Sequence, residues 1–281
     1  MPTMLVQRTM GPEDTGTDLA THADEAGEGS LRSGRGAAVL SARGLVKRYG
    51  GLLVTNRVDL DVLAGEVHAL VGPNGAGKTT LLAQLTGEVP SDEGRILFRG
   101  KDITSVPPYR RAQLGLARSF QITSVFAELS VLENVVFAVQ AKQGHSFRFW
   151  KSALADDGLT RPAHALLARV GLETEAERPA ADLSHGQHRQ LEIAIALAGE
   201  PAILLLDEPM AGMGLEDSAQ LTKMLLGLKG RIPMLLVEHD MDAVFALADR
   251  ITVLVYGERI VTGTPAEIRA HPEVQRAYLG V

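Results

Sequence analysis

A glycine-rich stretch carries the most specific chemical pattern in the sequence. It reads Gly72, Pro73, Asn74, Gly75, Ala76, Gly77, Lys78, Thr79 and Thr80, a full match to the phosphate-binding pattern G-x-x-x-x-G-K-[ST]. Glycines let the backbone turn tightly enough for consecutive N–H groups to face one anion. Lys78 adds a cation for the β- and γ-phosphates, and the Thr79 hydroxyl can bind Mg²⁺. The stretch predicts a nucleotide site; a plain glycine turn is the alternative.

Two acidic residues end a second apolar segment. Residues 203–206 are Ile, Leu, Leu and Leu, and Asp207 and Glu208 follow them. Such strand ends meet at the carboxyl edge of a parallel sheet, where ligands bind. We expect Asp207 to bind Mg²⁺, directly or through water, and Glu208 to accept a proton from the water that attacks the γ-phosphate. The alternative is a solvated strand end, because apolar strands often finish in Asp or Glu by chance.

A third pattern, Leu-Ser-His-Gly-Gln, occupies residues 183–187. It precedes an amphipathic segment that predicts a helix from Gln187 to Ala198. Ser184 supplies a hydroxyl, Gly186 a free backbone, and the helix start a positive dipole end, which together favour an anion. The chain therefore has two candidate phosphate sites.

The elements that position these residues predict an α/β fold. Residues 187–199, 215–229 and 240–248 alternate as helices with strands at 202–207, 234–237 and 251–256, the pattern of a parallel sheet with helical crossovers. Residues 58–62, 67–71 and 96–98 together suggest a small antiparallel sheet beside the glycine-rich loop. Residues 130–171 are mostly helical in pattern and form a candidate helical lobe, bordered by breaks at Pro107, Pro108 and Pro179.

Composition limits the remaining possibilities. The 281 residues are 45% hydrophobic and carry a net charge of −6, so we expect a large core and no nucleic-acid partner. There is no cysteine, which excludes disulfides and thiolate metal sites. No apolar run approaches the roughly 18–20 residues that cross a bilayer. Residues 1–37 are acidic and aperiodic, and we expect a disordered tail before a domain at 38–281.

Taken in order, these motifs resemble the ATP-binding-cassette (ABC) ATPases, whose signature runs Leu-Ser-Gly-Gly-Gln; here His185 replaces its third residue. The resemblance covers 38–281 and implies the P-loop NTPase fold of that family, with a parallel-sheet core, an antiparallel β subdomain and a helical subdomain at about 122–182. It implies ATP and Mg²⁺ as cofactors. It also implies that Ser184, Gly186 and Gln187 cap the ATP held by a second ABC ATPase subunit.

Three further positions match the family. Gln121 matches the glutamine that senses Mg²⁺ and the attacking water, and His239 the histidine that contacts the γ-phosphate. Tyr49 matches the aromatic residue that stacks on adenine. Each has a plain alternative: an exposed loop amide, a structural histidine at a strand end, and a packed surface tyrosine.

One loop departs from the family pattern. Residues 210–214 read Met-Ala-Gly-Met-Gly, so Gly214 stands where the family carries an Asp that contacts the partner subunit. The Ala-Gly-Met wording resembles the ATPases of bacterial importers for branched-chain and other hydrophobic amino acids. Residues 118–122, 125–135, 237–241, 263–268 and 277–280 resemble the same subgroup. Residues 145–150 lie at a variable insertion, where their aromatics pack the lobe or contact a permease.

The resemblance implies several partners: an identical or related second ATPase, two integral-membrane permease subunits and an extracytoplasmic substrate-binding protein. It places the chain at the cytoplasmic face of the membrane. Uptake of urea or amides, lipopolysaccharide export and a soluble non-transport ABC ATPase remain as alternatives. A simple phosphate-loop kinase fits worst, because it gives no role to residues 183–187 or to His239.

Overall fold

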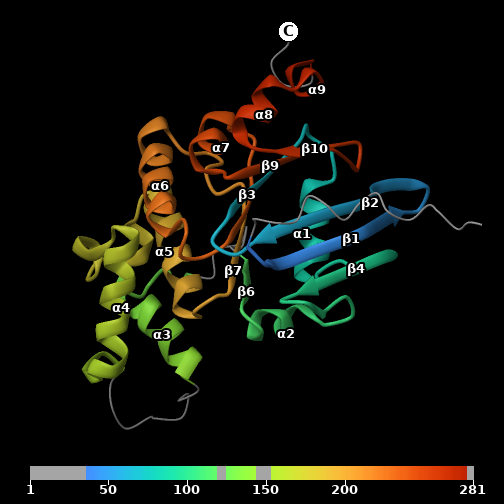
Figure 1. Ribbon diagram of the computed structural model, residues 1–281. Helices are drawn as coiled ribbons and strands as arrows, with labels where there is room; N and C mark the ends of the chain where they lie inside the picture. The colour runs from blue at the N-terminus through green and yellow to red at the C-terminus, as the bar shows by residue number, and fades with distance from the viewer. Residues whose placement is uncertain (1–35, 119–124, 144–152, 277–281) are drawn as a thin grey trace, which may run out of the picture. The chain divides into compact units, whose positions relative to one another are not determined.

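Two sheets organise the chain, of which the computed structural model describes residues 36–118, 125–143 and 153–276 (Figure 1). The smaller sheet is antiparallel and has the order β2 (Leu52–Leu63), β1 (Ala38–Tyr49), β4 (Glu93–Phe98), β5 (Lys101–Asp102). The larger sheet has the order β10 (Glu258–Gly263), β9 (Arg250–Val255), β3 (Val67–Val71), β8 (Met234–Val237), β7 (Ile203–Asp207), β6 (Leu116–Arg118). Its neighbours pair in parallel except β9 and β10, so β10 is an antiparallel edge strand.

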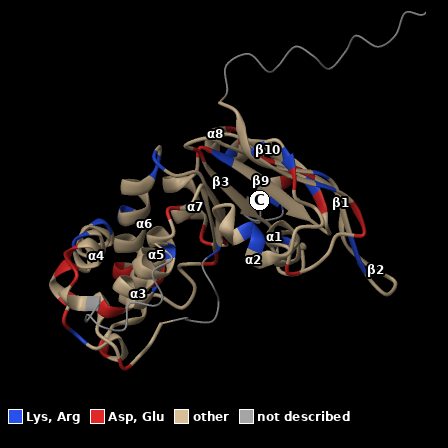
Figure 2. Cartoon of the chain, turned by 90° about the horizontal axis from the view of Figure 1, so that it is seen from below, with Lys and Arg blue, Asp and Glu red and all other residues tan. Residues whose placement is uncertain are grey.

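Helices connect and cover these strands. They are α1 (Lys78–Thr86), α2 (Pro108–Gln113), α3 (Val131–Gln143), α4 (Asp157–Val170), α5 (His185–Ala198), α6 (Leu215–Leu228), α7 (Met241–Leu247), α8 (Pro265–Ala270) and α9 (Pro272–Val274), with short 3₁₀ turns at Ala153–Ala155, Glu173–Glu175 and Ala180–Asp182. None of the described helices is long and apolar enough to span a membrane. Basic and acidic residues are intermixed along the chain on the α3–α4 side (Figure 2).

The sequence explains where the central elements form. Strands β3, β7 and β8 are buried along their whole lengths, as expected for strands covered on both faces. Asp156 caps α4 by accepting a hydrogen bond from the Gly158 N–H, and Gly171 ends the helix at a left-handed φ of 79°. Local capping chemistry thus sets the boundaries of α4.

Helix α1 joins the two sheets through one apolar core. Leu81, Leu82 and Leu85 of α1 are fully buried and belong to the same cluster as Leu60 of β2 and Leu70 of β3. A second cluster holds helices α3 to α6 against β7 and β8. The glycine-rich loop at the start of α1 is therefore held between two rigid layers.

The structure confirms the predicted α/β fold and corrects some of its parts. Residues 67–71 were expected in the antiparallel sheet, but β3 lies inside the larger sheet, between β8 and β9. A short apolar run fits either kind of sheet, so its pattern could not decide. Helix α5 begins at His185 rather than Gln187, and Pro108 begins α2 rather than breaking a helix. Strands β6 and β10 were not predicted.

Candidate nucleotide site

The glycine-rich loop lies between β3 and α1 and is enclosed by backbone. A Cβ at Gly72 would lie 2.3 Å from the Leu254 carbonyl oxygen, and one at Gly77 would lie 2.4 Å from the Val54 carbonyl oxygen. Gly77 also has a left-handed φ of 95°. Because backbone oxygens cannot retreat as a flexible side chain could, these two positions require glycine. Strands of both sheets therefore fix the shape of the loop.

Lys78 folds back over this loop. Its Nζ donates to the Gly72 carbonyl at 2.6 Å and to the Pro73 carbonyl at 3.1 Å. Burial lowers the pKa of Lys78, and the nearby carboxylates of Glu208 and Asp207 oppose that shift. The ammonium group therefore bonds the loop and lies within electrostatic reach of the acidic pair.

The acidic pair occupies the carboxyl end of β7. The Asp207 side chain is only 1% exposed, whereas Glu208 is 35% exposed. Glu208 has a φ of 45°, a left-handed conformation that costs energy for a residue with a side chain. Its N–H donates to the Val237 carbonyl at 2.8 Å, which ties the end of β7 to that of β8. Strain of this kind occurs often at functional sites.

His239 reaches the same edge from β8. Its Nδ1 lies 3.9 Å from Glu208 Oε2 and 3.7 Å from Glu238 Oε2, and the ring is largely exposed. Glu238 is fully buried and accepts hydrogen bonds from the Met210 N–H at 2.9 Å and the His239 N–H at 3.0 Å. One carboxylate therefore holds both His239 and the loop that follows Glu208.

Sequence reasoning missed two groups here, Glu238 and Arg118. Arg118 ends β6, and its Nη2 donates to Asp207 Oδ2 at 2.8 Å. Its Nη1 forms an ion pair with Glu88. The sequence offered only the acidic residue next to His239 and the basic residue at the end of a short strand. Neither pattern indicates a functional site until the fold is known.

The signature residues begin α5. Ser184 Oγ accepts a hydrogen bond from the Gln187 N–H, and Gln187 Oε1 accepts one from the Ser184 N–H, so the two form a capping box. A Cβ at Gly186 would lie 2.9 Å from Asp217 Cγ. His185 Nε2 lies 3.3 Å from the Ala211 carbonyl oxygen. The residue that departs from the family signature therefore contacts the loop after Glu208.

The remaining predicted positions are placed less fully. Tyr49 ends β1 with half of its surface exposed, and Lys47 Nζ lies 5.5 Å from its ring centroid. The exposed ring fits either stacking on a base or a plain surface position. Gln121 lies outside the described residues, as do residues 1–35, the aromatics at 145–150 and residues 277–280.

The donor set suits Mg²⁺ rather than a metal held by protein alone. Among the described residues, no group of three or more His, Cys, Asp or Glu side chains could hold a metal ion. Asp207 Oδ1 is buried and has no hydrogen-bond partner in the part of the chain that the structure describes. Mg²⁺ commonly binds one or two protein oxygens together with substrate phosphates. The Asp207 carboxylate, with its Oδ1 unbonded, meets that need.

Comparison with known proteins decides the family. The ABC transporter family matches residues 55–211, which include the glycine-rich loop, the signature and the acidic pair. The chain belongs to the ABC transporter ATP-binding family. It is therefore an ABC ATPase, a nucleotide-binding subunit of a membrane transport complex. The branched-chain amino acid ATP-binding cassette transporter family also matches residues 258–281.

Relatives and solved structures support this assignment. The ABC ATPase is 39% identical to the high-affinity branched-chain amino acid transport ATP-binding protein LivG of Escherichia coli (strain K12), over 86% of this chain and 98% of that protein. It is 36% identical to the corresponding protein BraF of Pseudomonas aeruginosa, with the same coverage of 86% and 98%. The ADP conformation of MJ1267, an ATP-binding cassette of an ABC transporter, matches with a TM-score of 0.76, 30% identity and coverage of 87% of this chain and 100% of that one.

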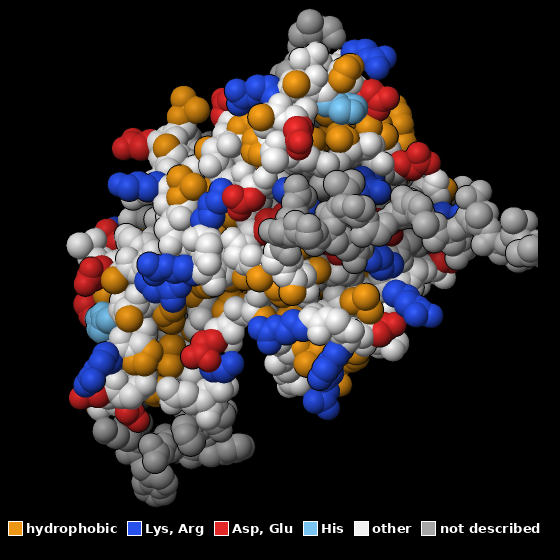
Figure 3. Space-filling model, in the orientation of Figure 1, with side chains coloured by type: hydrophobic (Ala, Val, Ile, Leu, Met, Phe, Trp, Pro, Cys, Tyr) orange, Lys and Arg blue, Asp and Glu red, His pale blue; other side chains and the backbone are white. Residues whose placement is uncertain are grey.

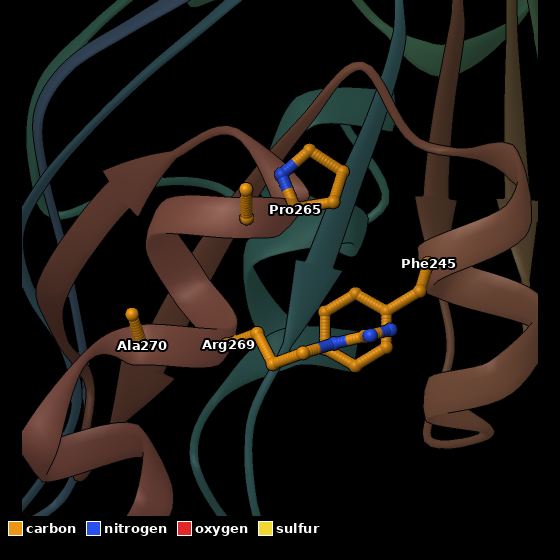
Figure 4. Close-up of a pocket in the computed structure, with 5 residues that line it drawn as sticks. Phe245, Pro265, Arg269 and Ala270 are labelled. Atoms are coloured by element: carbon orange, nitrogen blue, oxygen red, sulfur yellow. The ribbon is translucent and has the colours of Figure 1, made fainter.

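A separate hollow of about 420 Å³ lies where α7 and α8 face each other (Figure 4). Phe245, Pro265 and Arg269 line it with two alanines, and the Arg269 guanidinium stacks 4.3 Å from the Phe245 ring centroid. Arg269 is the one charged group among the described residues that line it. Because this cation is already stacked on the Phe245 ring, we interpret the hollow as a packing feature of the ABC ATPase.

Proposed function

We propose that this ABC ATPase powers an importer of branched-chain or other hydrophobic amino acids. Two matches carry the proposal, one over nearly the whole chain and one over a short C-terminal segment. LivG is similar over 98% of its length, and the branched-chain family matches residues 258–281, outside the conserved ATPase motifs. Nucleotide motifs are shared by all cassettes and do not indicate cargo, whereas the C-terminal match is specific to one transport class.

We propose that the phosphate loop, residues 72–80, binds ATP. Its N–H groups and Lys78 would hold the β- and γ-phosphates, and Tyr49 would stack on adenine. Thr79, Asp207 and Gln121 would hold Mg²⁺, and the under-bonded Asp207 Oδ1 supports this set. Bound Mg²⁺ would neutralise charge on the phosphates during hydrolysis.

Proton transfer is proposed for Glu208. Its carboxylate is partly exposed at the edge of the sheet, where water has access, and its strained backbone is held by Val237. His239, 3.9 Å from that carboxylate, would donate to the γ-phosphate. Gln121 would orient the attacking water. The distances suit hydrogen bonds that tighten when nucleotide enters, as in many nucleotide-free sites.

We propose that the signature acts on a partner subunit. Ser184 and Gln187 satisfy each other in the capping box, and the first amides of α5 remain as anion donors. Together with Gly186 they would cap ATP held by a second cassette, identical or related. Leu215, which follows Gly214, is 94% exposed, so an apolar side chain is available on this face for a partner.

The permease contact is proposed at an apolar hollow on the helical side, between the proposed subdomain at about 122–182 and α5. The hollow measures about 460 Å³ and is lined by Phe126, Leu129, Asn134, Phe137, Ala138, Ala141 and Ile195. Phe126 is 61% exposed, and its ring meets that of Phe137 edge to face. Hydrophobic side chains gather over α3 and α5 beside an indentation (Figure 3). Exposed aromatics of this kind mark a protein contact.

Copurification tests the proposal. The tagged Glu208→Gln variant is expressed in its native host, and membranes are solubilised with ATP present to hold the closed assembly. We expect two polytopic permeases, a second cassette and an associated extracytoplasmic binding protein that takes branched-chain amino acids. Lys78→Ala, which should lose nucleotide binding, is the matched control for ATP-dependent recovery. Recovery of soluble partners alone would contradict the transport role.

A further inference from the structure

Arg118 forms a three-residue charge cluster beside the phosphate loop. One guanidinium nitrogen binds Asp207 Oδ2 at 2.8 Å, and the other pairs with Glu88. The exposed fractions of the side chains are 10% for Arg118, 1% for Asp207 and 40% for Glu88. Arg118 therefore bridges a buried carboxylate and a partly exposed one.

The buried carboxylate requires a cation at all times. An ionised Asp207 without a partner would cost several kcal/mol at this depth. Among the described residues, Arg118 is the one that forms an ion pair with Asp207, while Lys78 directs its Nζ to the Gly72 and Pro73 carbonyls. The pairing also leaves Asp207 Oδ1 without a hydrogen-bond partner in the described part of the chain. Arg118 thus neutralises the residue proposed to bind Mg²⁺ without saturating it.

We propose that Arg118 is a stand-in cation for the metal: it holds Asp207 in the nucleotide-free protein and passes wholly to Glu88 when MgATP loads. This inference rests on the proposed role of Asp207 as a Mg²⁺ ligand. The two acids bind different guanidinium nitrogens, so Arg118 can release Asp207 while it keeps Glu88. Two cations at one buried carboxylate repel each other, which gives the exchange its direction.

The exchange predicts opposite effects for substitutions of Arg118 and of its second acidic partner, Glu88. Arg118→Met leaves Asp207 with no competing cation, so the tightening of ATP binding by Mg²⁺ should rise about tenfold. Glu88→Gln removes the acceptor that draws Arg118 away, so the same tightening should fall about threefold. Arg118→Lys keeps the charge but loses the forked geometry, and it should lie between wild type and Arg118→Met.

The measurement is the dissociation constant of ATP with Mg²⁺ and with EDTA, taken by calorimetry on the full chain, so hydrolysis is not the readout. The melting temperature without ligand is recorded in parallel, and Arg118→Met should lower it. Arg110→Gln is the control, because Arg110 is exposed on α2, and its guanidinium donates to Gln113 Oε1 and lies over the Tyr109 ring, away from the charge cluster. It should change neither quantity.

Asp207→Asn separates this inference from the proposed metal site. Asp207→Asn should remove most of the Mg²⁺ effect, and Arg118→Met should then add nothing, because both act through one carboxylate. If Arg118→Met weakens the Mg²⁺ effect, or keeps its influence in the Asp207→Asn background, the stand-in role is overturned. If Asp207→Asn leaves the Mg²⁺ effect intact, the metal site itself fails. If Arg118→Met does not fold, Glu88→Gln still tests the inference, because a substitution at this partly exposed position should be tolerated. An unchanged Mg²⁺ effect in Glu88→Gln would then overturn the stand-in role.

Discussion

The two ends of the larger sheet both bury charge, but they treat it differently. At the amino end, Glu66 accepts hydrogen bonds from the Arg250 Nε at 2.7 Å and the Leu63 N–H at 2.9 Å, and pairs with His68 Nδ1 at 2.9 Å. His68 Nε2 bonds Thr252 Oγ1 at 2.8 Å. At the carboxyl end, Asp207 Oδ1 lacks a partner among the described residues, and Glu208 is strained.

This difference separates a structural charge network from a functional one. Burial alone would raise the pKa of Glu66, but the hydrogen bonds from His68 and Arg250 lower it to about 2. Both carboxylate oxygens of Glu66 and both ring nitrogens of His68 thus have hydrogen-bond partners. At the carboxyl end, the described residues leave Asp207 Oδ1 without a hydrogen bond and hold Glu208 at a strained φ, two features that are common at ligand sites. The following substitutions should therefore affect stability at one end and nucleotide chemistry at the other.

The largest effect is expected for Glu208→Gln. Removing the proposed base should lower the rate of ATP hydrolysis about a thousandfold, in the range of lost general-base catalysis. Affinity for MgATP should remain, because the amide keeps the shape of the side chain. Hydrolysis by the purified cassette, with its partner ATPase where required, and nucleotide binding are measured together. Normal turnover would show that another group is the base.

At the amino end, Arg250→Met should reduce the free energy of unfolding by roughly 3–4 kcal/mol, because it leaves Glu66 buried without its cation. Chemical denaturation followed by circular dichroism measures this change, and MgATP affinity should not move. Arg48→Met is the matched control: Arg48 and Glu93 lie 3.6 Å apart with both side chains about half exposed. Its effect should stay below about 1 kcal/mol. Equal effects would contradict the comparison.

Acid should weaken the fold through the same network. Burial lowers the pKa of His68 below its usual 6.5, so below that pH the unfolded chain binds a proton that the folded chain does not. Glu66, with a pKa of about 2 in place of 4.5, stabilises the fold above pH 4.5 and loses this contribution as pH falls toward 2. The Glu66 share is about 3 kcal/mol. Chemical denaturation at pH values from 7 to 3 should show this fall in the free energy of unfolding. In Glu66→Gln, the free energy of unfolding should depend less on pH in the acidic part of this range.

A smaller effect is expected for Glu238→Gln. The Glu238 carboxylate now accepts hydrogen bonds from the Met210 and His239 N–H groups. In the variant, the amide NH₂ group would face one of these donors, so one of the two hydrogen bonds should be lost. We expect about a tenfold loss in hydrolysis rate and roughly 1–2 kcal/mol in stability. Glu66→Gln should lower stability without this loss of rate. A Glu238→Gln enzyme with full activity would make Glu238 structural, like Glu66.

The sequence best predicts the features that depend on residues close together in the chain. The phosphate loop, the acids at the end of β7 and the fold class all follow from local patterns, and the described structure brings Lys78, Asp207, Glu208 and His239 to one edge. The proposed role of Arg118 depends on its bond to Asp207, 89 residues away, and that of Glu238 on its bond to Met210, 28 residues away. Such pairings exist only after folding, and no spacing rule records them.

Sheet membership was harder to predict than strand position. Residues 67–71 are apolar except for His68 and buried throughout, which fits a strand of any orientation, and their neighbours β8 and β9 lie far along the chain. Strand β6 has three residues, too few for a period, and β10 has an exposed, polar start. Strands of this kind form because they pair with a neighbouring strand, and that neighbour is in place only in the folded chain.

The turn between β9 and β10 has a consequence for synthesis of the chain. The Gly257 N–H donates to the Ala76 carbonyl of the phosphate loop at 3.0 Å, and the Gly257 carbonyl accepts from the Asn56 N–H at 2.8 Å. A nascent chain that ends before β9 lacks this support and the Leu254 wall behind Gly72. ATP capture should therefore begin only after the ribosome has released most of the protein, so the nucleotide cannot template the early steps of folding.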